Sequence, residues 1–133
     1  MNRISVWGLL ILVFLAASLF VAHKQFSLQR DRCGQQLVQL IPKLDVYAQN
    51  HSGQLPASLD ELRQAVGMLP VPINEDAQFL MSNRQLRWKS TDAPEPFLWE
   101  SRAHTFVGGI HVLYSDGSVR LDQSVPLPRR YEN

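Results

Sequence analysis

The sequence predicts an α+β protein in which an N-terminal transmembrane helix continues into a long stalk helix packed on a small antiparallel sheet of four or five strands. Three observations support this class. Residues 4–22 carry no charged side chain. Apolar residues then follow helical spacing to about residue 50, and from residue 77 their spacing changes to the two-residue period of strands. The predicted organisation is an anchor over residues 1–23, an α+β head with its helical stalk over residues 24–122, and a flexible tail over residues 123–133.

The anchor is the apolar run from Ile4 to Ala22. Its length matches the roughly 20 residues that a helix needs to cross about 30 Å of hydrocarbon. The alternative is a cleaved signal peptide that begins at Arg3 and is cut at the small residues 16–18, although the apolar run continues past that site. The flanking charges are nearly balanced and do not predict the orientation. The large side chains expected to contact lipid are Ile4, Trp7, Leu10, Phe14 and Phe20.

The stalk helix is expected to run from the anchor to Asn50. From Leu37 onward its apolar residues keep the three-and-four spacing of one helical face. Pro42 removes an internal hydrogen bond and is expected to kink the helix, and the alternative is two helices broken near Gly34. Cys33 is the single cysteine, so the chain can form neither an internal disulfide nor a zinc site built from several thiolates. Cys33 is expected to face the apolar stripe of the stalk, and the alternatives are palmitoylation or an inter-chain disulfide.

A turn and a short helix follow the stalk. Gly53 is suited to a left-handed C-cap after residue 50. Ser58 and Glu61 form a capping-box pattern in which the Glu61 carboxylate is expected to reach the N–H of the cap residue. The short helix is predicted to stop at Gly67.

The rest of the chain is predicted to form the sheet. Residues 77–81 and 85–89 are expected to pair as a hairpin, and residues 96–100 form a third strand. Residues 110–114 and 118–121 flank Asp116-Gly117, whose predicted type I′ turn needs positive φ at both central residues. The break at Gly108-Gly109 before that hairpin indicates a turn or bulge, and the alternative is a site where the backbone of a partner approaches closely. The aromatic residues Trp88, Trp99 and Tyr114 are expected to form the core of the sheet, and the alternative is a ligand platform.

Composition and motifs favour a protein that is not an enzyme. The net charge of +1 does not indicate nucleic-acid binding. The sequence has no Gly-x-Ser-x-Gly, no glycine-rich phosphate loop and no His-Glu-x-x-His, and we expect no cofactor. The alternative is a metal or hydrolytic site on Glu100, His104 and Asp116, because imidazole and carboxylate groups bind transition metals. The turn already accounts for Asp116, and His111 alternates with Val112 along a strand and could be exposed.

Two stretches resemble the type IV pilins and pseudopilins. Residues 44–59, LDVYAQNHSGQLPASL, resemble the end of the long pseudopilin helix, where a Tyr-bearing helix is followed by a Gly, a Pro and a short capped helix. Residues 96–119 resemble a prepilin-like bacterial family whose C-terminal signature is a His, nine residues and Asp-Gly. Here eleven residues separate His104 from Asp116. The residues that match the signature are Trp99, Glu100, His104, Gly108, Gly109, Asp116 and Gly117.

The resemblance implies a non-enzymatic, membrane-anchored structural protein of a bacterial secretion or pilus-like system. Its partners would be the lipid bilayer and other envelope or pilin-like proteins, and its head would lie in the periplasm or outside the cell, with Arg3 in the cytoplasm. Pilins are cut after a Gly and carry a Glu five residues later, whereas here Val13 occupies that position after Gly8. An uncleaved anchor in the inner membrane is therefore expected. The alternatives are an accessory single-span subunit of an unrelated membrane complex and a membrane-tethered metal-binding or enzymatic domain.

Overall fold

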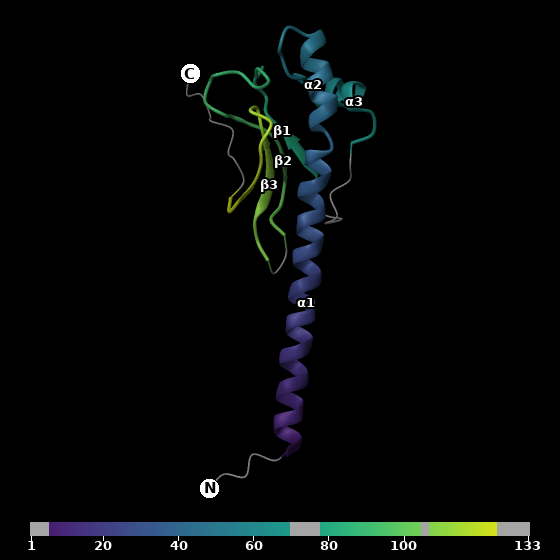
Figure 1. Cartoon of the computed structure of the whole chain (residues 1–133), viewed down its shortest axis with the longest axis vertical. Helices are drawn as coiled ribbons and strands as arrows, with labels where there is room; N and C mark the ends of the chain where they lie inside the picture. The colour runs from purple at the N-terminus through teal and green to yellow at the C-terminus, as the bar shows by residue number, and fades with distance from the viewer. Residues whose placement is uncertain (1–5, 70–77, 105–106, 125–133) are drawn as a thin grey trace.

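The computed structural model describes residues 6–69, 78–104 and 107–124, which form helices followed by an antiparallel sheet (Figure 1). The sheet has the strand order β1-β2-β3-β4 in this part of the chain. It lies beside the C-terminal part of α1 and beside α2, while the N-terminal part of α1 extends away from the head. The structure confirms the predicted α+β class with a long N-terminal helix. The elements are α1 (Val6–Val38), α2 (Ile41–Asn50), α3 (Leu59–Val66), β1 (Phe79–Met81), β2 (Pro96–Glu100), β3 (Ile110–Tyr114) and β4 (Val119–Asp122).

The long helix is interrupted just before Pro42, not at Gly34. Helix α1 continues through Gly34 to Val38, and a two-residue turn separates it from α2. Pro42 has no N–H to donate to the carbonyl of Val38, and its ring crowds that same carbonyl. The interruption therefore falls between Val38 and Pro42. Within the turn, the Leu40 N–H donates to the Leu37 carbonyl at 3.1 Å, which is the tighter three-residue spacing.

The predicted apolar stripe of the stalk forms the helical side of the core. The buried residues of the stripe follow three-and-four spacing across both helices, and the sheet supplies Leu98 and Leu113 to the same core. Cys33 lies on this stripe and is completely buried, as expected. The stripe consists of Cys33, Leu37, Leu40, Leu44 and Ala48.

The caps of α2 and α3 confirm the predicted boundaries and differ in detail. Ser52 and Gly53 both have positive φ, and the Gly53 N–H donates to the Ala48 carbonyl at 2.7 Å. At α3, the Ser58 hydroxyl accepts from the Glu61 N–H at 3.2 Å, as the capping box requires. The Glu61 carboxylate, however, accepts from the N–H of Ala57 instead of that of Ser58. Helix α3 ends before Gly67 as predicted.

The predicted hairpin of residues 77–81 and 85–89 is wrong. Strand β1 pairs with β2, with Leu80 opposite Trp99, and Ala77 lies outside the described residues. The 85–89 segment lies beside the end of α2, where the Trp88 N–H donates to the Gly53 carbonyl at 2.8 Å. The alternation of apolar and polar residues in this segment correctly indicates which side chains are buried, because Leu86 and Trp88 are in the main core. It does not indicate which segment the backbone pairs with.

The hairpin between β3 and β4 forms as predicted, with a different turn. The Gly117 N–H donates to the Tyr114 carbonyl at 3.0 Å, and the Tyr114 N–H donates to the Ser118 carbonyl at 2.9 Å. Gly117 has positive φ, but Asp116 is not among the described positive-φ residues, so the type I′ turn is wrong. A three-residue loop with one left-handed glycine replaces it. Residues 125–133 of the predicted tail lie outside the described residues.

Candidate functional site

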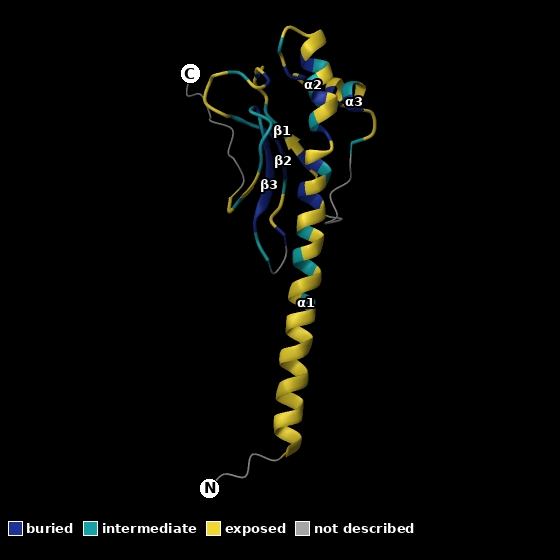
Figure 2. Ribbon diagram, viewed as in Figure 1, coloured by how far each residue is buried: buried dark blue, intermediate teal, exposed yellow. Residues whose placement is uncertain are grey.

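The N-terminal part of α1 presents an uncovered apolar surface (Figure 2). Every residue from Val6 to Val21 is exposed. Among the described residues, one helix is long and apolar enough to cross a membrane, and it begins with this segment; a signal sequence would meet the same test. The predicted lipid-facing residue Ile4 lies outside the described residues. The exposed fractions of the others are 76% for Trp7, 54% for Leu10, 74% for Phe14 and 62% for Phe20.

A second feature is a buried polar cluster between α1 and the sheet, centred on Glu100 at the end of β2. Glu100 is only 1% exposed. Its Oε2 accepts from the backbone N–H of His111 at 2.9 Å and lies 3.2 Å from the Nδ1 of the same residue. A carboxylate removed from water needs such partners, because burying it unpaired is costly. His111, which the sequence analysis left open as exposed, is 7% exposed and belongs to this buried cluster.

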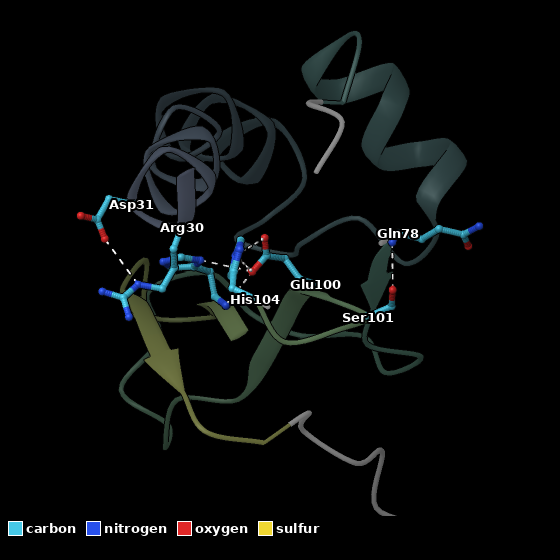
Figure 3. A network of polar contacts seen from close by, with 7 residues as sticks. Arg30, Asp31, Gln78, Glu100, Ser101 and His104 are labelled. Atoms are coloured by element: carbon cyan, nitrogen blue, oxygen red, sulfur yellow. Dashed lines mark hydrogen bonds and ion pairs between the residues drawn. The ribbon is translucent and has the colours of Figure 1, made fainter. Parts of the chain in front are cut away.

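His104 closes the cluster from the loop between β2 and β3 (Figure 3). Its Nε2 lies 3.1 Å from both carboxylate oxygens of Glu100, and the figure shows the two side chains pointing toward each other beside α1. The rings of His104 and His111 meet edge to face with centroids 5.6 Å apart. Glu100 therefore lies between two imidazoles that come from different segments.

The two glycines of the predicted break shape this loop. The His104 N–H donates to the Gly109 carbonyl at 3.1 Å, and the Gly108 N–H donates to the His104 carbonyl at 2.8 Å. Both glycines have positive φ. A Cβ on Gly109 would lie 2.6 Å from Cδ1 of Leu121, so the close approach at this site is made by the chain's own β4. The turn prediction is confirmed, and the turn returns His104 to Glu100.

Helix α1 forms the other wall of the cluster through Cys33 and Gly34. The Cys33 side chain lies close to Glu100 and helps to lower the pKa of its carboxylate. One ligand atom from each of Cys33, Glu100 and His104 lies within 4.8 Å of the others, and all three residues are buried. A Cβ on Gly34 would lie 2.9 Å from Cδ2 and Nε2 of His111, so the ring packs directly on the helix backbone. The two adjacent small residues Cys33 and Gly34 are the feature of the sequence that could indicate this close contact between α1 and the sheet.

The electrostatics of the cluster keep Glu100 ionised. Burial raises the pKa of Glu100, but the hydrogen bonds from His111, the electrostatic interaction with His104 and the interaction with Cys33 together hold that pKa below its ordinary value. The cluster therefore combines a carboxylate, a thiol and two imidazoles. Because each is at most 9% exposed, it is suited to internal pairing or to holding a small ion and not to binding a large substrate.

The structure does not bring the predicted candidate Asp116 to Glu100 and His104. Asp116 lies in the turn after β3 and does not belong to the group of potential ligands formed by Cys33, Glu100 and His104. Its Oδ1 accepts from the N–H and hydroxyl of Ser118 at 2.9 and 2.6 Å. These bonds, together with Arg120, hold the pKa of Asp116 below its ordinary value. Asp116 thus stabilises the turn that contains Gly117. Cys33, and not Asp116, is the third residue beside Glu100 and His104.

The aromatic residues are divided between two separate cores. Trp88 belongs to the main core beneath the helices. Trp99 packs with Ile110 and Val112 in a second cluster, against which Tyr114 is partly buried. The expectation that these aromatics form the core of the sheet holds only in part: Trp99 is buried in a strand, Tyr114 is partly buried, and Trp88 lies in the main core from a segment outside the strands.

No protein-family model, no curated protein and no solved structure was found to match this chain.

Proposed function

We propose that this protein is a membrane-anchored, pseudopilin-like structural protein without enzymatic activity, whose head contacts other proteins of a bacterial envelope assembly. One observation carries the proposal. Helix α1 is apolar and exposed from Val6 to Val21, and the same helix is packed against the sheet from Cys33 onward. A single rigid element therefore joins the segment that would lie in the bilayer to the core of the head.

The length of α1 would fix the head at a set height. Cys33 is eleven residues beyond Ala22, which corresponds to about 16 Å of helix. With no flexible linker between the two, a membrane-embedded α1 would present the sheet and α3 in one orientation. In this proposal the anchor lies in the inner membrane with Arg3 in the cytoplasm, and the head lies in the periplasm or outside the cell.

A second candidate is an accessory single-span subunit of an unrelated membrane complex. Val13 favours it, because pilins carry a Glu at that position, whereas here residues 6–22 of α1 carry no charged side chain. An uncharged span suits a helix that remains in the bilayer by itself. Both candidates need the same retained anchor, so the anchor is tested first.

The anchor can be tested with two pairs of arginine substitutions on the same helix. Leu12→Arg with Leu15→Arg places two charges within the proposed span, at positions that are 69% and 58% exposed. The control, Gln25→Arg with Leu28→Arg, adds the same charge at the same spacing beyond the span, where Leu28 is 59% exposed. An arginine at the centre of a membrane helix costs about 2.5–3.5 kcal/mol on insertion scales. The readout is the fraction that remains in membranes after alkaline carbonate extraction.

The proposal expects the wild type and the control pair to remain in the membrane pellet and the Leu12/Leu15 pair to be lost from it. An exposed helix of a soluble protein would respond equally to both pairs. Extraction of the wild type into the soluble fraction, or identical fractionation of the two pairs, would contradict the proposal.

A further inference from the structure

We propose that Cys33, Glu100 and His104 bind one divalent transition-metal ion of the Zn²⁺ type, which joins α1 to the sheet. This inference does not depend on the proposed function. It rests on three potential ligands that the fold brings together from a helix, a strand end and a loop. Their ligand atoms lie within 4.8 Å of one another.

The donor set selects the class of metal. It offers one sulfur, one imidazole nitrogen and one carboxylate oxygen, which are the donors that Zn²⁺ accepts. Calcium and magnesium prefer six or more oxygen ligands and would not use the thiol. Zinc sites with three protein ligands leave a fourth tetrahedral position to water. Co²⁺ binds similar sites and is therefore a suitable spectroscopic probe.

His111 supports the site without being one of the three ligands. Its backbone N–H and Nδ1 both face Oε2 of Glu100, which leaves Oε1 for the ion. Metal sites commonly use such outer partners to orient a ligating carboxylate. Gly34 gives the His111 ring its place against α1, because any Cβ there would overlap the ring.

Binding of the metal ion displaces protons that the cluster holds when the ion is absent. In the structure the Cys33 sulfur lies within 4.8 Å of a carboxylate oxygen of Glu100, and the His104 Nε2 lies 3.1 Å from the same carboxylate. Ligation needs a thiolate and an unprotonated Nε2. The thiol proton therefore leaves to solvent, and the proton that Nε2 of His104 directs at the carboxylate must leave that nitrogen, either for Nδ1 of the same ring or for solvent. Each bound ion releases one proton from the thiol, and the carboxylate enters the site already ionised.

Metal binding is expected to stabilise the packing of α1 against the sheet. Cys33 is far from Glu100 and His104 in the sequence, so the complete site exists only in the folded chain. An ion that binds the folded state and not the unfolded state stabilises it in proportion to the logarithm of the free ion concentration. The thermal unfolding temperature of the head should therefore rise with added Zn²⁺.

The test uses the full chain in detergent micelles, without a polyhistidine tag, titrated with Co²⁺. Because Cys33 is the only cysteine, a thiolate-to-cobalt charge-transfer band can come only from this residue. The expected result is this band, together with the visible spectrum of a tetrahedral ion, saturating at one Co²⁺ per chain and displaced by Zn²⁺. No band in a chain that circular dichroism shows to be folded would overturn the proposal.

Variants separate a built site from a single thiolate that binds cobalt by itself. Cys33→Ser should abolish the band. Loss of an outer partner already weakens metal binding about 10–100-fold, so His104→Gln should weaken it at least about 100-fold. The matched control is His51→Gln, which changes an exposed histidine outside the cluster and should bind as the wild type does. Equal binding by His104→Gln and His51→Gln would overturn the proposal.

Discussion

Gly34 of α1 lies directly against the ring of His111 of β3. A Cβ at position 34 would be 2.9 Å from both Cδ2 and Nε2 of that ring, which is closer than carbon atoms normally approach. The ring has little room to retreat, because its Nδ1 lies 3.2 Å from Oε2 of the buried Glu100. The contact sets the distance between the stalk helix and the sheet.

Gly34→Ala should therefore destabilise the head even though alanine favours a helix. The gain in helix propensity is about 0.5–1 kcal/mol, whereas forcing extra volume into a packed core costs about 1–3 kcal/mol. The matched control is Gln35→Ala at the next, exposed position, which should change stability by less than about 0.5 kcal/mol. Denaturant unfolding of the full chain in detergent measures both. A Gly34→Ala protein as stable as the wild type would show that the ring is not held against the helix.

Glu100→Gln should also destabilise the head. The amide keeps one acceptor but replaces the other with a donor, which then faces donors from His111 or the side chain of His104. A buried donor or acceptor left without a partner costs about 1–3 kcal/mol. Glu95→Gln is the control, because the Glu95 carboxylate is 42% exposed and its ion pair with Arg84 is at the surface, where such pairs contribute about 0–1 kcal/mol. Equal losses in the two variants would argue against a special role for the buried carboxylate.

Asp45 should give the head a pH-dependent contribution to stability. Hydrogen bonds from Lys89 and then Trp88 hold the pKa of Asp45 below its ordinary value of 3.8. Because the folded pKa is lowered, this contribution is present above pH 3.8 and is lost as the pH falls below that value. The side chain is 35% exposed, so the contribution is on the order of 1 kcal/mol or less.

The measurement is the difference in unfolding free energy between the wild type and Asp45→Asn, taken well above and well below pH 3.8. The wild type should be the more stable at the higher pH, and the difference should shrink at the lower pH. A difference that stays constant across this interval would mean that the bonds from Trp88 and Lys89 do not depend on the charge of Asp45.

The elements with strong local signals could be predicted from the sequence. The apolar run ending at Ala22, the stripe through Leu37 and Leu44, and the cap at Ser58 each follow from residue spacing within one segment. Residue spacing within one segment predicts strands β2 to β4 for the same reason. The position of the helix break also follows from Pro42, once the lost bond to the carbonyl four residues earlier is considered.

Long-range pairing could not be predicted in the same way. The alternation of Leu86 and Trp88 shows which side chains are buried but not whether the backbone pairs with β1 or with the segment after α2. Alternation along β3 does not reveal that His111 is buried, because both faces of this strand are covered and its neighbours Ile110 and Val112 are buried as well. Cys33 joins the cluster only through the docking of α1 on the sheet, which no local pattern describes.

The proposed function requires that this chain keeps its apolar helix as a membrane anchor for the head. The most direct test is the intact mass of the protein extracted from membranes of its native host. The expected result is the full-length mass of about 15.2 kDa, or that mass without Met1. A mass that begins at Leu9 would show prepilin-type processing despite Val13. A mass that begins at Leu19 would show a cleaved signal peptide and a released head, and it would contradict the claim.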